Sequence, residues 1–239
     1  MPEISHTPEK VSERKIVVYK TLVDPTVIKI AGERLKTRLF TRFWFLRPAP
    51  EEIQSVSVEK YYEPYFLVDG EYTIDYYRRR YYTFNIDEKV QEVIVLDKTL
   101  KPDLPKKFTK TPYKSITLSL IHISEPTRQA CLVLDETGRE VDPKRVPAAP
   151  SEEHPKKVLA NLRETMEKLK ATPNKEVGVL RSKIVRRPPD AERVVQELFN
   201  VSERSVIYVP VYKLTFKSAR TGEVKTAKID GVTGRAIWW

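Results

Sequence analysis

Two long runs with the residue pattern of β-strands constrain the fold of this chain more than any other feature. The first run covers residues 56–100, and the second covers residues 205–229. Both runs are rich in β-branched and aromatic residues, which is typical of strands that bury one face. Each run follows a segment with helical periodicity. The sequence therefore predicts an α+β fold with two antiparallel β modules, each covered by helices.

Turn and capping signals mark the boundaries of these elements. Asp24 and Pro25 are typical of an N-cap and a first helical position, which predicts a helix over residues 25–43. The pair Asp69-Gly70 lies between two apolar runs and predicts a hairpin turn. Further helices are expected over residues 151–172 and 191–200, with a short helix passing into a strand over residues 178–185.

The two β runs share short motifs. Tyr62-Glu63-Pro64 and Tyr208-Val209-Pro210 lie near their beginnings, and the pattern T-x-x-I-D ends at Asp87 and at Asp230. This shared order favours an internal duplication, with chance similarity as the alternative. Because proline has no N–H group, both prolines are expected at a sheet edge or a bulge.

The second of these runs, residues 205–237, resembles the small β modules of PepSY type. The resemblance rests on the aromatic-proline strand at Tyr208 and on the turn Asp230-Gly231-Val232-Thr233-Gly234. It implies a non-catalytic binding or regulatory module.

Residues 118–128, LSLIHISEPTR, resemble the translation of a sequencing adapter used for transposon-based libraries. The resemblance implies a metagenomic assembly with an adapter at an internal junction. Residues 118–130 are therefore expected to make few contacts and to interrupt strand pairing. With this junction, the predicted divisions of the chain are residues 1–117, 118–130, 131–175 and 176–239.

The composition excludes several kinds of functional site. The single cysteine, Cys131, and three scattered histidines, His6, His122 and His154, predict no metal site, and the seven glycines form no phosphate-binding loop. We expect no cofactor and no catalytic residues. No apolar run is long enough to span a bilayer and the N-terminus has no signal-peptide pattern, which predicts a cytoplasmic protein. Few Asn, Gln, Met and Cys beside 18 prolines resemble the composition of proteins from thermophiles and predict an archaeon-like, thermophilic source.

The chain has 43 Lys and Arg against 33 Asp and Glu, a net charge of +10. The most unusual segment is Tyr76, Tyr77, Arg78, Arg79, Arg80 and Tyr81. Arginines contact phosphates and tyrosines stack on bases, so this segment is a candidate site for single-stranded nucleic acid. The alternative is that the tyrosines pack across a sheet while the arginines reach solvent. Helix 25–43 is basic, and it either packs on the sheet or contacts an anionic membrane.

These observations predict a non-enzymatic interaction or adaptor protein that binds a protein partner or nucleic acid. The alternatives are a nucleic-acid-binding protein that uses the Tyr/Arg segment and an enzyme of unrecognised type.

Overall fold

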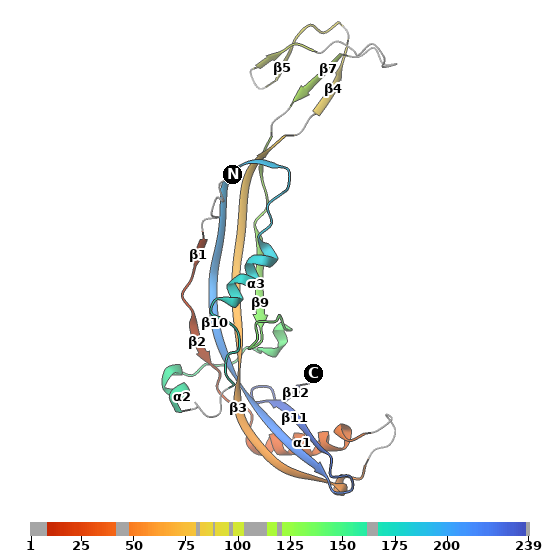
Figure 1. Ribbon diagram of the computed structural model, residues 1–239, viewed down its shortest axis with the longest axis vertical. Coiled ribbons are helices and arrows are strands. Elements are labelled where there is room, and N and C mark those ends of the chain that lie inside the picture. The colour runs from red at the N-terminus through yellow and green to blue at the C-terminus, as the bar shows by residue number, and fades with distance from the viewer. Residues whose placement is uncertain are drawn as a thin grey trace. The chain divides into compact units, whose positions relative to one another are not determined.

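The computed structural model describes residues 9–41, 48–79, 82–87, 89–95, 98–102, 114–118, 121–161 and 167–237. The fold is mixed α+β, as predicted (Figure 1). Most of its strands join one large sheet, where two separate β modules were expected. The helices and strands, in chain order, are β1 (Glu9–Val11), β2 (Lys15–Val18), α1 (Pro25–Leu39), β3 (Ile53–Arg78), β4 (Tyr82–Ile86), β5 (Val93–Val95), β6 (Lys98–Leu100), β7 (Lys114–Leu118), β8 (Ile121–Ser124), β9 (Arg128–Leu134), α2 (Pro155–Asn161), α3 (Lys175–Ile184), β10 (Ala191–Ser218), β11 (Val224–Asp230) and β12 (Ala236–Ile237).

The chain forms two compact units, and each is assembled from segments that are not consecutive in the sequence. One unit contains Met1–Glu9, Tyr72–Arg128 and Val185–Phe199, and the other contains Lys10–Glu71, Gln129–Ile184 and Asn200–Trp239. We call them the first and the second unit. The boundaries expected from the sequence instead divide the chain into consecutive pieces.

The large sheet has the strand order β12-β11-β10-β3-β8, with β1 and β2 paired to β10 and β9 paired to β3. In the second unit β10 and β11 form an antiparallel hairpin in which Val211 pairs with Asp230 and Lys217 with Val224. The turn between them includes Gly222, whose φ of 70° lies in the left-handed region that favours glycine. The sequence Ala219-Arg220-Thr221-Gly222 predicts a turn between two strands, and the structure confirms it.

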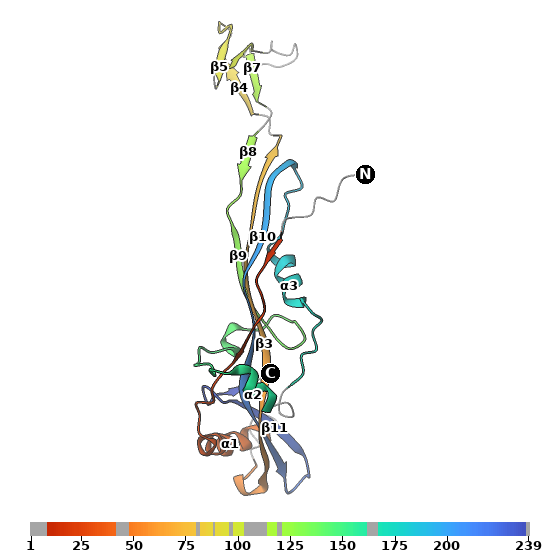
Figure 2. The same ribbon diagram turned by 90° about the vertical axis from the view of Figure 1, so that its left-hand side faces the viewer.

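Helix α1 begins and packs as its sequence predicts. The side chain of Asp24 accepts a hydrogen bond from the backbone N–H of Thr26 at 2.7 Å, and Pro25 is the first helical residue. One face of the helix packs on β10 and β11, and Figure 2 shows α1 on one side of this part of the sheet. Residues 42 and 43, the predicted end of the helix, lie outside the described residues. The buried residues of this core are Ile28, Phe40, Ile53, Tyr212, Leu214, Phe216, Ala227 and Ile229.

The predicted hairpin at Asp69-Gly70 is wrong. Strand β3 continues through both residues without a turn. A Cβ atom on Gly70 would lie 2.5 Å from the carbonyl oxygen of Asn200 and 2.9 Å from Leu180. Position 70 therefore requires glycine because β10 and α3 approach the backbone of β3 too closely for a side chain. Glycine inside a strand often marks such a close approach.

The predicted helix over residues 191–200 is also wrong, because this segment is the first part of β10. The residues are good helix formers, and Asp190 looks like an N-cap. Burial instead alternates, with Glu197, Phe199 and Val201 all buried. This period of two is that of a strand with one covered face.

The other two helices differ from prediction in their bounds. Helix α2 covers Pro155–Asn161 rather than beginning at residue 151, and residues 162–166 lie outside the described part of the chain. Helix α3 covers Lys175–Ile184, three residues earlier than its predicted start.

Pro210 does not lie on an edge strand of the sheet, because β10 is an interior strand. On one side of β10, residues 205–208 pair with β2 and residues 211–217 pair with β11. Pro210 falls between these partners, where its missing N–H removes no ladder hydrogen bond, and its carbonyl accepts the N–H of Gly231 at 2.8 Å.

The two motif-bearing runs pair differently. The second T-x-x-I-D motif lies on β11, which pairs with β10. The first lies largely on β4, which pairs with β7 in a separate two-stranded sheet. The similar strand pairing expected of a duplication is therefore not observed between these strands.

The segment that resembles an adapter does take part in strand pairing. Strand β8 pairs with β3 from Asp75–Ser124 to Arg78–Ile121, and Glu125 continues this pairing through its N–H to the carbonyl of Ile74. The expected interruption of pairing is therefore wrong for the described residues, while residues 119 and 120 lie outside them. β8 is the last strand in this order, and its side chains alternate between half-buried and exposed.

Candidate functional sites

The Tyr/Arg segment lies at the end of β3, in the first unit. Tyr76 is 2% exposed, and its hydroxyl donates to Glu125 at 3.1 Å. Tyr77 is half-buried, and its ring centroid lies 5.1 Å from that of His122. Burial leaves the ring of Tyr76 no open face for a base. Arg80 and Tyr81 lie outside the described residues.

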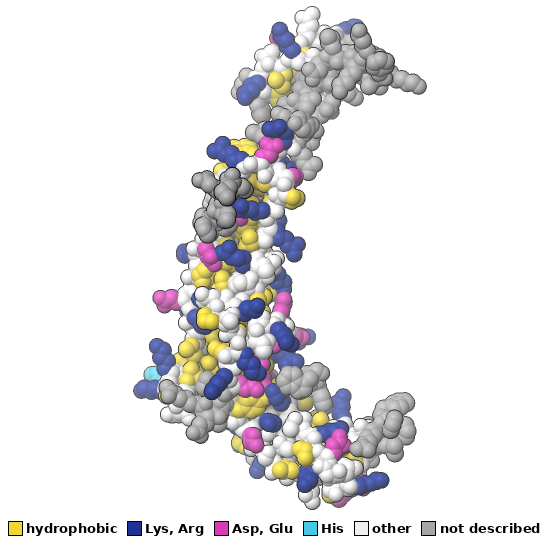
Figure 3. Space-filling model, in the orientation of Figure 1, with side chains coloured by type: hydrophobic (Ala, Val, Ile, Leu, Met, Phe, Trp, Pro, Cys, Tyr) yellow, Lys and Arg dark blue, Asp and Glu magenta, His cyan; other side chains and the backbone are white. Residues whose placement is uncertain are grey.

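The two arginines of this segment that the structure describes each face a carboxylate. Arg78 Nη1 lies 3.4 Å from Asp190 Oδ2, and Arg79 Nε lies 3.2 Å from Glu192 Oε1. Exposed ion pairs of this kind contribute about 0–1 kcal/mol, so a phosphate could displace the carboxylates at low cost. Figure 3 shows Lys and Arg side chains interspersed with Asp and Glu on the face it displays. Nucleic-acid binding by this segment stays a prediction.

The outer face of α1 combines apolar and basic side chains. Val27 and Ile30 are 52% and 53% exposed, and Arg34 and Arg38 follow them on the same stripe with their side chains also exposed. None of these four residues belongs to the core cluster that contains Ile28. The stripe forms a surface with an apolar first half and a basic second half, which we call the α1 outer face.

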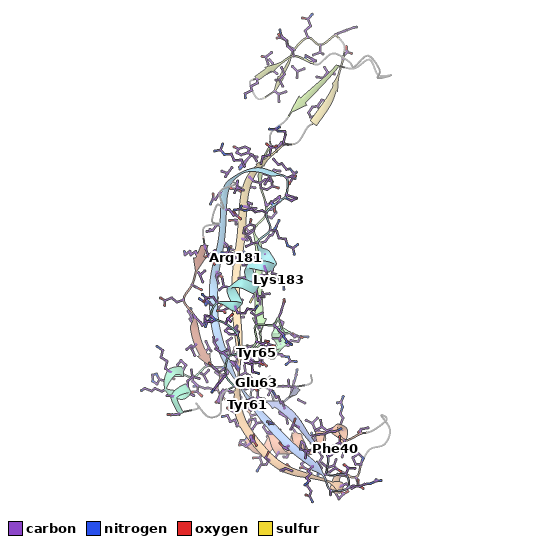
Figure 4. All side chains as sticks on the ribbon, viewed as in Figure 1. Phe40, Tyr61, Glu63, Tyr65, Arg181 and Lys183 are labelled. Atoms are coloured by element: carbon purple, nitrogen blue, oxygen red, sulfur yellow. The ribbon has the colours of Figure 1, made fainter. Side chains whose placement is uncertain are left out.

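A buried polar cluster around Glu63 lies on β3 in the second unit. Tyr61, Glu63 and Tyr65 occupy alternate positions on the strand and share one face, as Figure 4 shows. The Glu63 carboxylate, 5% exposed, accepts hydrogen bonds from the hydroxyls of Tyr61 at 2.6 Å and Tyr65 at 2.9 Å. Lys228 of β11 lies 2.5 Å from the same carboxylate. The buried charge of Glu63 is thus paired and hydrogen-bonded, as stable burial requires.

This cluster raises the pKa of both tyrosines. Burial is the largest cause, and the neighbouring Glu63 carboxylate adds to it because phenolate and carboxylate repel each other. The folded-state pKa lies above the unfolded value of about 10, so the folded protein holds these protons more tightly. This contribution to stability is present below about pH 10 and is lost as the pH rises above it.

We therefore expect Tyr61 and Tyr65 to stay protonated at a pH where exposed tyrosines ionise. Phenolate absorbance, followed from pH 8 upward, should show a late phase that is smaller in the Tyr61→Phe/Tyr65→Phe variant. Tyr72 and Tyr208, whose pKa burial also raises, account for part of what remains. The free energy of unfolding of this variant should also fall less steeply with pH. A wild-type titration in a single phase near pH 10 would contradict this assignment.

A pocket of about 570 Å³ lies beside the cluster in the second unit. Tyr65 belongs to both, because its hydroxyl bonds Glu63 and its side chain lines the pocket. The remaining lining residues come from the loop at residues 142–147 and from the C-terminal hairpin. They are Asp142, Lys144, Arg145, Pro147, Asp230, Thr233, Arg235, Ala236 and Ile237.

Sequence reasoning missed both the cluster and the pocket. The period-two spacing of Tyr61, Glu63 and Tyr65 is a signal of a shared face that could have indicated the cluster. Lys228, the partner of Glu63, is 165 positions away, and the sequence carries no sign of this pairing.

A comparison with protein-family models, with curated proteins and with solved structures finds no match to this chain. None of the helices in the described part of the chain is long and apolar enough to cross a membrane. The described residues also contain no group of three or more His, Cys, Asp or Glu side chains placed to hold a metal ion.

Proposed function

We propose that this chain is a non-enzymatic interaction protein that docks an acidic protein partner on the α1 outer face. The observation that supports this proposal is the exposure of Val27 and Ile30 directly beside Arg34 and Arg38. Leu22, just before the helix, is 55% exposed as well. Single exposed apolar residues are common, but a group of them rimmed by charge is typical of interaction surfaces.

The charge of the α1 outer face indicates that its partner is acidic. Between Pro25 and Leu39 the helix carries four Lys or Arg residues and one glutamate, and that glutamate, Glu33, forms an ion pair with Lys36 at 2.6 Å. The face is therefore net basic and should attract a partner with Asp or Glu around an apolar contact.

The proposal includes the finer architecture expected from the sequence. We propose that the two β runs descend from one duplicated module with a covering helix and that their strands have since paired differently. The packing of α1 on β10 and β11 supports one such covered module. The PepSY-like motif in residues 205–237 supports a binding role for it.

Selection of peptides from a displayed random library tests the docking proposal. Wild-type protein should enrich peptides that combine an apolar residue with Asp or Glu. Val27→Glu/Ile30→Glu should weaken their binding by about tenfold or more, because it removes apolar contact and repels an acidic ligand. Peptide dissociation constants from fluorescence polarisation measure this loss.

Val224→Glu is the matched control, since Val224 is 56% exposed but lies on β11 in the same unit. It should bind the peptides as the wild type does. Vesicles of phosphatidylserine and single-stranded poly(U) complete the test. The protein-partner proposal fails if no peptide distinguishes the wild type from the glutamate variant. It also fails if the vesicles or poly(U) bind to the wild type and not to the glutamate variant. Loss of poly(U) binding in Arg78→Ala/Arg79→Ala would favour the nucleic-acid alternative instead.

A further inference from the structure

We propose that the pocket between the 142–147 loop and the C-terminal hairpin binds a small organic anion, a carboxylate or phosphate monoester with an apolar body. The site is distinct from the α1 outer face, and none of its lining residues lies on α1. Its volume of about 570 Å³ falls in the range of pockets that hold small molecules.

The charge lining the pocket favours an anion. Three cationic side chains, Lys144, Arg145 and Arg235, line it together with two carboxylates. Both carboxylates already accept hydrogen bonds from the backbone of their own turns. Asp142 accepts from the N–H of Lys144 at 2.9 Å, and Asp230 accepts from the N–H of Val232 at 2.6 Å. These bonds hold the carboxylates within their own turns, and the three cations against two carboxylates leave the lining with one net positive charge.

Two of the polar residues that line the pocket are buried. Tyr65 is 5% exposed and Asp230 is 7% exposed. The Tyr65 hydroxyl donates to Glu63, whose own charge is paired with Lys228. Arg145 is a second polar partner of Tyr65 and is itself half-buried. Hydrogen bonds to Glu63 and Arg145 therefore hold Tyr65 in place, and only a small part of its side chain is exposed to a ligand.

The apolar part of the lining indicates more than an inorganic ion. Pro147, Ala236, Ile237 and the ring of Tyr65 offer carbon surface beside the cationic groups. A bare phosphate would leave this surface in water, whereas an anion with a hydrocarbon body would cover it.

Isothermal titration with four probes tests the inference. Phenyl phosphate and benzoate carry the expected combination, inorganic phosphate lacks the apolar body, and benzamide lacks the charge. At low salt at least one of the first two should bind at millimolar concentration or below. Inorganic phosphate and benzamide should bind at least about tenfold more weakly, and added salt should weaken the binding.

Lys144→Gln/Arg235→Gln should weaken the binding of the organic anion by about tenfold or more, because both exposed cations at the pocket are removed. Lys217→Gln removes one positive charge from an exposed position outside the pocket lining and should leave affinity unchanged. Circular dichroism confirms that each variant is folded. The inference is overturned if neither organic anion binds, if benzamide binds as well as benzoate, or if the double variant binds as the wild type does.

Discussion

Replacing Arg204 with methionine should lower the free energy of unfolding by about 3–5 kcal/mol, because it removes the more buried of the two arginines that pair with a buried carboxylate. Glu176, at the start of α3, is 1% exposed, and its Oε1 receives Arg204 Nε at 2.7 Å and Arg14 Nη2 at 2.6 Å. Arg204 is itself only 12% exposed, so solvent cannot replace the lost partner. Urea unfolding followed by circular dichroism measures the change.

Two further variants separate charge from packing. Arg14→Met should cost less, because Arg14 is 30% exposed and Arg204 still pairs the carboxylate. Arg14→Met/Glu176→Leu/Arg204→Met removes all three charges and should recover much of the loss, as replacement of buried ion clusters by apolar residues commonly does. If Arg204→Met and the triple variant lost the same free energy of unfolding, the cost would come from lost packing and not from the unpaired charge of Glu176.

The same cluster makes stability depend on acid. Burial alone would raise the pKa of Glu176, but hydrogen bonds from Arg204 and Arg14 outweigh it and hold the pKa below its ordinary value. The stabilising contribution is therefore present above the unfolded pKa of about 4.3 and is lost as the pH falls through the folded value. Glu176→Gln should remove this part of the acid dependence.

Replacing Gly70 with valine should lower the free energy of unfolding by about 3 kcal/mol, at the upper end of the cost of overpacking. The new Cβ would meet the backbone oxygen of Asn200 at 2.5 Å, and backbone cannot move aside as a flexible side chain can. Thermal and urea unfolding measure the loss.

Gly178→Ala is the control for this prediction. Gly178 lies inside α3 with no atom within 4 Å of a new Cβ, so alanine should stabilise the protein by about 0.5–1 kcal/mol. If Gly70→Val were tolerated as well as Gly178→Ala, the close approach of β10 and α3 to β3 would be contradicted.

The local signals that predicted correctly act through neighbours in the chain. Asp24 and Pro25 begin α1, because capping involves only the first turn of the helix. Gly222 closes the hairpin between β10 and β11, because only the backbone of four residues is involved.

The signals that misled depend on partners far along the chain. Asp69-Gly70 would form a turn in isolation, and residues 191–200 would favour a helix, but in the folded chain both belong to long strands. Burial of alternate side chains on a sheet outweighs local propensities of a few tenths to one kcal/mol per residue. The pairing of Glu63 with Lys228 and the joining of two distant loops around Tyr65 have the same origin. Neighbours in the chain determine where a helix begins or a hairpin turns. Contacts between distant segments determine which strands continue and which side chains meet, because the apolar surfaces of these segments leave water only when the chain folds.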